Sequence, residues 1–120
     1  MKTSLLTVSN NQEKRRYKRH SPGLPLRVFD RGTGLGIGPL ANISLDGLKV
    51  YCAHDYDPGA VIVFAMVLPV RINGSRNVSF EGRCAWSLQS EKEEFEAGFE
   101  ITQISASNKT ILKLLTTKFC

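Results

Sequence analysis

The chain has 120 residues, of which 42% are hydrophobic and 22% charged, and this length fits one domain that folds without disulfides or metals. Its formal net charge of +5 is local, because residues 1–20 hold six basic residues and one acidic residue and the remaining hundred residues are formally neutral. A neutral body argues against a protein that binds nucleic acid over its whole surface and favours one anion-binding segment.

The N-terminal segment is predicted to lack regular structure. Residues 1–12 are polar, and their broken apolar run lacks the continuous core of a signal peptide, so we expect a flexible tail. The basic residues 14–19 (KRRYKR) follow, and two prolines and a glycine within residues 22–25 disfavour a helix. We therefore assign residues 13–120 to one domain that begins with a mobile basic arm, residues 13–23.

The chain after residue 25 is predicted to be all-β up to about residue 102. Runs rich in Val, Ile, Phe and Leu alternate with turn residues, as expected of antiparallel strands. The sequence around Leu45-Asp46-Gly47 predicts a tight turn. The expected strands are residues 26–30, 36–43, 48–53, 61–72, 78–88 and 95–102. Six short strands in this length predict a small closed antiparallel barrel.

A C-terminal helix is predicted over about residues 106–119. Ser105 or Ser107 is a candidate N-cap. The apolar residues at helical spacing are Ile111, Leu114, Leu115 and Phe119. The predicted fold class is therefore mainly β, a six-stranded antiparallel barrel with a flexible N-terminal arm and a C-terminal α-helix that plugs or flanks the barrel.

Cysteine usage and hydropathy indicate the compartment. The three cysteines are odd in number and lack CxxC spacing, which predicts neither a disulfide framework nor a zinc site. The sequence contains no run of eighteen apolar residues, so we expect no membrane span. We expect a cytoplasmic protein with no metal and no cofactor.

The histidines, the strand cysteine, the tryptophan and the acidic loop are weak candidates for a functional site. His20 and His54 lack a paired nucleophile or metal-ligand spacing, and no nucleophile, base and oxyanion set can be assembled, so an enzyme is not expected. Cys84 and Trp86 lie in an apolar strand and are predicted to be buried; the alternative for Trp86 is contact with a ligand or partner. The glutamates within residues 91–96 are predicted to be solvated.

Two short segments carry the chemistry of a guanine and phosphate receptor. Arg15 and Arg19 lie on one side of an extended chain, roughly 13 Å apart, and an arginine fork matches both the N7 and O6 acceptors of guanine and a phosphate. Asn42 and Ser44 would face one side of a strand and offer acceptors to guanine N1–H and its 2-amino group. Gly47 permits a positive φ and leaves no side chain in the way of a ligand.

Each segment alone has a simpler interpretation. A basic hexapeptide is most often a solvated tail or a nonspecific nucleic-acid arm. Residues 44–47 equally suit a plain hairpin turn, with Asn42 hydrogen-bonded to the backbone at a strand end.

The two segments in combination resemble the motifs of the PilZ domain, a bacterial receptor for cyclic di-GMP. Residues 15–19 (RRYKR) match its RxxxR motif, and residues 42–47 (NISLDG) match [DN]xSxxG before a β-strand. Residues 82–86 (GRCAW) and 97–101 (AGFEI) are similar to the closing strands of the family. The resemblance covers nearly all of residues 13–119.

This resemblance implies a six-stranded barrel that holds cyclic di-GMP between the arm and its outer surface. The guanine and phosphate contacts fall to Arg15 and Arg19, and the barrel side of the site to the [DN]xSxxG motif. The implied contact residues are Lys14, Arg15, Arg16, Arg19, Asn42, Ser44 and Gly47. Asn42 stands where the family often has Asp, so its contact with guanine loses charge assistance. Family members bind one ligand or an intercalated pair, and the sequence leaves both open.

The leading hypothesis is a non-enzymatic receptor. Cyclic di-GMP would order the basic arm on the barrel, and an unidentified downstream protein partner would recognise the changed surface. A small β-barrel nucleic-acid-binding protein that uses the arm on phosphates is an alternative, which the neutral body and the scattered aromatic residues disfavour. A ligand-independent adaptor with the same barrel is a third interpretation, which the intact motif residues disfavour.

Overall fold

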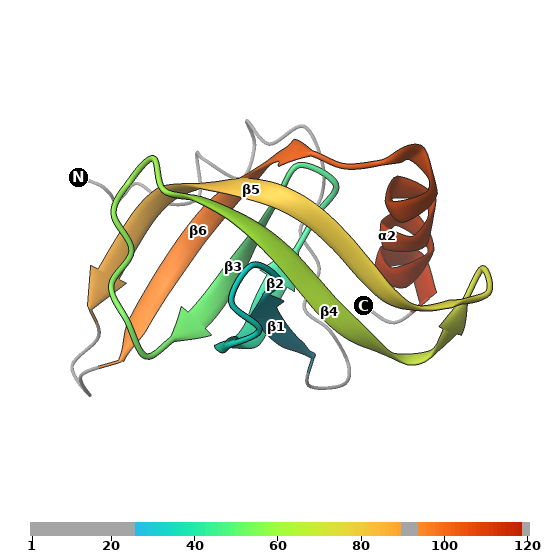
Figure 1. Ribbon diagram of the computed structural model, residues 1–120, viewed down its shortest axis with the longest axis horizontal. Coiled ribbons are helices and arrows are strands. Elements are labelled where there is room, and N and C mark those ends of the chain that lie inside the picture. Colours follow the sequence, from blue (N-terminus) through green and yellow to red (C-terminus); the bar gives the residue numbers. More distant parts are fainter. Residues whose placement is uncertain (1–25, 90–93, 119–120) are drawn as a thin grey trace.

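The computed structural model describes residues 26–89 and 94–118. Its six strands are β1 (Arg27–Asp30), β2 (Gly36–Ile43), β3 (Gly47–Cys52), β4 (Val61–Ile72), β5 (Ser75–Gln89) and β6 (Phe95–Gln103). They close into an antiparallel barrel in the order β1-β2-β3-β6-β5-β4 (Figure 1). The predicted fold class, an antiparallel six-stranded barrel with a C-terminal helix, is therefore confirmed. The predicted flexible tail and mobile arm, residues 1–12 and 13–23, lie outside the described residues.

The turns set the bounds of the strands. β2 and β4 have the bounds expected from the sequence, and β1, β3 and β6 differ by one residue at one or both ends. β5 begins at Ser75 instead of residue 78. Asn73 and Gly74, with φ of 51° and 82°, form a two-residue turn, so Ile72 pairs directly with Ser75 and the ladder reaches the turn.

The core fills the inside of the barrel. Inward-facing residues alternate with outward-facing ones along the strands, and the fully buried Phe64 has its ring 4.8 Å from that of Phe99 and 5.7 Å from that of Phe80. Cys84 is buried in this core, as predicted, and Cys52 is buried as well; both are free thiols. Burial raises the pKa of the Cys52 thiol to about 11.

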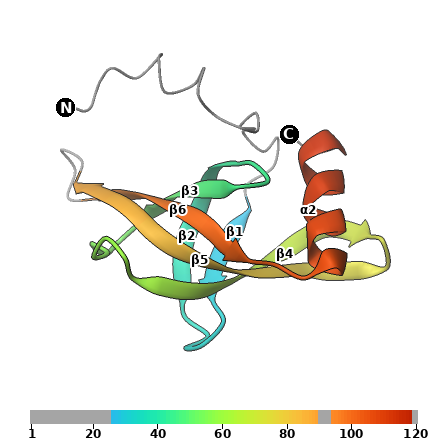
Figure 2. The same cartoon turned by 90° about the horizontal axis from the view of Figure 1, so that it is seen from above.

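The helix α2 (Ala106–Lys118) packs on β5 and β4, beside their connecting turn (Figures 1 and 2). Ser105 caps it, because its Oγ accepts a hydrogen bond from the backbone N–H of Asn108 at 3.1 Å.

The buried face of α2 is displaced from the predicted one. Leu112 and Thr116 are buried along with Ile111 and Leu115, whereas Leu114 is only partly buried, because the stripe that faces the sheet runs through residues i, i+1, i+4 and i+5. The buried hydroxyl of Thr116 is satisfied by the backbone carbonyl of residue 113 at 2.9 Å. The predicted contact of Phe119 lies outside the described residues.

Candidate ligand-binding site

The predicted tight turn joins β2 and β3, and Ser44 builds it. Ser44 is 1% exposed; its N–H donates to the carbonyl oxygen of Gly47 at 2.8 Å, and its hydroxyl donates to the carboxylate of Asp46. The carbonyl oxygen of Asp46 accepts from the N–H of Ile101 at 2.9 Å, which ties the turn to the β6 strand. The hydroxyl of Ser44 therefore fixes the shape of the turn.

The motif residues of the barrel lie together at this turn. Asn42 lies in β2, which ends at Ile43, and Ser44 lies in the turn with only 1% of its surface exposed. Gly47 is buried, pairs with Glu100 and is not among the described glycines with a positive φ, so the turn does not use the conformational freedom that the sequence offered. Of the two properties expected of Gly47, only its lack of a side chain contributes to the site.

The arm residues of the predicted site lie outside the described residues. They are Lys14, Arg15, Arg16 and Arg19. Their contacts with a ligand stay a prediction.

A row of four residues crosses the outer surface of the barrel beside the turn. Asn42 of β2 pairs with Lys49 of β3, Lys49 pairs with Gly98 of β6, and Gly98 pairs with Trp86 of β5. Adjacent strands lie ~4.8 Å apart, so Asn42 and Trp86 are about 14 Å apart along the sheet. We call these four residues the cross-strand row. Its length is similar to the expected span between the two arginines of the arm.

Both ends of the row are turned outward by irregularities in the sheet. The ladder between β2 and β3 shifts register between Leu40 and Asn42, and the ladder between β5 and β6 shifts between Cys84 and Trp86. Leu40 and Cys84 point into the core, and strict alternation would send the residues two positions later inward too. The extra residue in each strand reverses that direction.

The prediction that Trp86 is buried is therefore wrong, because the residue is 37% exposed. A Cβ atom built at Gly98 would lie 2.3 Å from Nε1 and 2.4 Å from Cε2 of Trp86, so the indole rests directly on the backbone of β6. Only glycine leaves room for this contact. Trp86 thus presents an apolar, aromatic surface at the end of the row opposite Asn42.

A groove of about 440 Å³ extends from the β2–β3 turn to Trp86. Asp46 lines it at the turn, and the residues of β6 from Gly98 to Thr102 line it along the sheet. The groove gives a ligand a concave surface between the motif residues and the indole.

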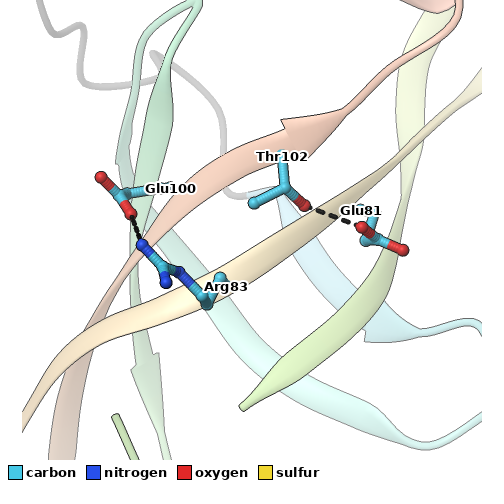
Figure 3. A network of polar contacts seen from close by, with 4 residues as sticks. All are labelled: Glu81, Arg83, Glu100 and Thr102. Carbon is cyan, nitrogen blue, oxygen red and sulfur yellow. Dashed lines mark hydrogen bonds and ion pairs between the residues drawn. The ribbon is translucent and has the colours of Figure 1, made fainter. Parts of the chain in front are cut away.

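Polar pairs that join β5 and β6 border this groove. Arg83 lies 2.9 Å from the Oε1 atom of Glu100, and the hydroxyl of Thr102 donates to Glu81 at 2.9 Å (Figure 3). The side chains of Arg83 and Glu100 are more than half exposed, so their ion pair contributes little to stability. It does hold the Arg83 guanidinium across the sheet.

Sequence reasoning missed Lys49, which lies in the middle of the row. Its Nζ atom is 2.9 Å from Oε1 of Glu96 and 5.9 Å from the ring centroid of Tyr51. Glu96, predicted to be solvated, is thus paired with a cation. The sequence did contain a signal for Lys49: it follows Gly47 by two residues and therefore lies on the same face of the strand.

Comparison with known proteins identifies the family. The profile of the PilZ domain matches residues 13–118. The chain belongs to the PilZ domain family. The matched segment includes both motifs and every described strand. No curated protein matches the chain.

Solved structures share the fold of this PilZ domain. The Bacillus subtilis inhibitor of motility MotI/DgrA superposes with a TM-score of 0.71 at 20% identity, covering 88% of this chain and 50% of that one. The PilZ domain of YcgR from Escherichia coli, solved with c-di-GMP, superposes with a TM-score of 0.62 at 13% identity, covering 88% and 91%. A second structure of YcgR with c-di-GMP has a TM-score of 0.62 at 16% identity, covering 83% and 43%. This PilZ chain spans about half the length of the Bacillus protein.

The described part of the chain offers neither a metal site nor a membrane-spanning helix. Residues 26–89 and 94–118 contain no group of three or more His, Cys, Asp or Glu side chains arranged to hold a metal ion. Within the same residues, no helix has both the length and the apolar character needed to cross a bilayer.

Proposed function

We propose that this PilZ domain is a receptor for cyclic di-GMP, which it holds between the basic arm and the outer surface of β2, β3, β6 and β5. The observation that carries the proposal is the cross-strand row beside the β2–β3 turn. It joins a hydrogen-bonding amide, a cation, a glycine and an exposed indole on one surface. The E. coli YcgR PilZ domain, which has this fold, was solved with c-di-GMP.

Each part of the ligand has a complementary group. The guanidinium groups of Arg15 and Arg19 match the Hoogsteen edge of guanine and the phosphates, and Lys14 and Arg16 add positive charge. The amide of Asn42 accepts from guanine N1–H or its 2-amino group.

The rest of the surface supports these contacts. Trp86 offers an indole face on which a guanine can stack, an interaction worth ~1–3 kcal/mol per base. Gly47 adds no side chain beside the turn. We assign Ser44 a positioning role, because its hydroxyl is engaged within the turn by Asp46.

Ligand binding would order the arm and so change the surface that a protein partner recognises. A segment rich in charge, proline and glycine cannot order itself by apolar burial, whereas two guanines and two phosphates supply charge-assisted hydrogen bonds. This is a non-enzymatic role. The free buried thiols of Cys52 and Cys84 fit a reducing, cytoplasmic compartment.

Calorimetric titration of the full chain with cyclic di-GMP tests the proposal. We expect saturable binding that cyclic di-AMP, GTP and a short oligonucleotide do not reproduce. Arg15→Ala and Arg19→Ala should each weaken binding by at least about tenfold, because each removes a charge-assisted, bidentate contact. Arg76→Ala is the matched control, since Arg76 is exposed near the β4–β5 turn and should leave the affinity unchanged.

Two results would contradict the receptor assignment. Unchanged affinity in both arm variants would separate binding from the RxxxR motif. Tight binding of the oligonucleotide that falls steeply with salt, without saturation by cyclic di-GMP, would favour the nucleic-acid alternative.

A further inference from the structure

Lys49 occupies the centre of the proposed binding surface. It lies between Asn42 and Gly98 in the cross-strand row, and its neighbours Leu48 and Val50 are fully buried, so its side chain points outward. A ligand that spans the row from Asn42 to Trp86 must therefore pass Lys49.

An ion pair holds the Lys49 ammonium away from the turn. The outward-facing residues of β3 and β6 form successive rows: Gly47 with Glu100 next to the turn, then Lys49 with Gly98, then Tyr51 with Glu96. The Lys49 Nζ atom lies 2.9 Å from Glu96, a residue of the row farther from the turn. The carboxylate thus draws the positive charge toward Tyr51.

We propose that Lys49 is a phosphate-binding residue of this site and that Glu96 competes with the ligand phosphate for its ammonium group. The inference rests on the proposed function and adds a residue that sets affinity. An ammonium binds phosphate as a point charge, and a lysine stem can swing between two anions. The side chains of Lys49 and Glu96 are 29% and 35% exposed, so water screens their ion pair and a phosphate can displace the carboxylate.

The competition predicts effects of opposite sign for the two partners. Lys49→Met should weaken the binding of cyclic di-GMP by about tenfold, the scale of one charge-assisted hydrogen bond, and should reduce the dependence of affinity on salt. Glu96→Gln should tighten binding by roughly threefold or more, because it frees the ammonium and removes a negative charge beside an anionic ligand.

The double variant tests whether the two residues act through each other. Glu96→Gln should improve the affinity of the wild-type chain more than that of Lys49→Met, because most of its benefit requires the ammonium. Arg76→Met controls for the loss of one positive charge. Thermal melting of each variant checks folding, and Glu96→Gln, which preserves the size of the side chain, tests the inference even if Lys49→Met is unstable.

The outcomes separate this inference from the proposed function. If the wild-type chain binds cyclic di-GMP and Arg15→Ala loses it, but Lys49→Met binds as the wild type does, the inference about Lys49 fails alone. If Glu96→Gln weakens binding, the ion pair supports the site and the competition is refuted. If the wild-type chain does not bind cyclic di-GMP, the proposed function and the inference fail together.

Discussion

Gly98→Ala tests whether the indole of Trp86 lies on β6. The added Cβ would be 2.3 Å from Nε1 of Trp86, far inside the 3.4–4 Å of ordinary contact, so the indole must move by more than an ångström. Gly98 is not one of the described glycines with a positive φ, which leaves the clash with the side chain as the cause of any effect.

The expected loss of stability in Gly98→Ala is modest because the indole has room to move outward. Overpacking costs ~1–3 kcal/mol, and the 37% exposure of Trp86 puts Gly98→Ala at about 1–2 kcal/mol of unfolding free energy, or roughly 5–10 °C in Tm. Urea unfolding followed by circular dichroism measures this loss. Trp86 is the only tryptophan of the chain, so the shift of its fluorescence maximum to longer wavelength reports the displacement directly.

Two controls separate the clash from a general effect of alanine. Gly36→Ala places a Cβ 3.7 Å from the ring of Phe29, an ordinary contact, and should not destabilise the barrel. In a Trp86→Ala background, Gly98→Ala should cost less than about 0.5 kcal/mol, because the obstructing atoms are gone. An unchanged fluorescence maximum with unchanged stability, or the same cost in both backgrounds, would refute the placement of Trp86.

Two further predictions concern the turn and the core. Ser44→Ala leaves the carboxylate of Asp46 without the hydroxyl that donates to it. We therefore expect the free energy of unfolding, measured in urea, to fall by about 1–2 kcal/mol. Unchanged stability of the free chain would mean that the hydroxyl of Ser44 serves mainly the ligand. The folded chain keeps the Cys52 thiol protonated to about pH 11, and the unfolded chain loses that proton near its ordinary value of 9.0, so the free energy of unfolding should fall by up to about 3 kcal/mol between pH 9 and 11. Cys52→Ala should make this fall shallower, and an identical pH profile in the variant would assign the effect to other groups.

Most of the fold could be predicted because local patterns determine it. The long apolar strand Val61–Ile72 and the strand Gly36–Ile43 end at turn residues, and their bounds follow from composition alone. The β2–β3 turn could be predicted for the same reason. The buried face of α2 could not be predicted in full. Apolar spacing locates the apolar stripe of the helix, but the sheet on which the helix packs determines which edge of that stripe is buried.

The binding surface was less predictable because it depends on register between distant strands. Parity shows that Lys49 faces outward, but its ion pair with Glu96 requires the pairing of Tyr51 with Glu96, which no local pattern gives. The orientation of Trp86 depends on the shift of register after Cys84, and a single extra residue reverses what alternation predicts.

Two of the five register shifts between the described strands lie at the ends of the proposed binding surface. Asn42 and Trp86 each come directly after a register shift, and each would point into the core without it. Gly98, between them, gives up a side chain so that the indole can rest on β6. An extra residue or a glycine in a strand weakens the ladder or its packing, although such features also help a small barrel to curve and close. In this row they serve the proposed site as well, because they present an amide at one end, an aromatic face at the other and the Lys49 side chain between them.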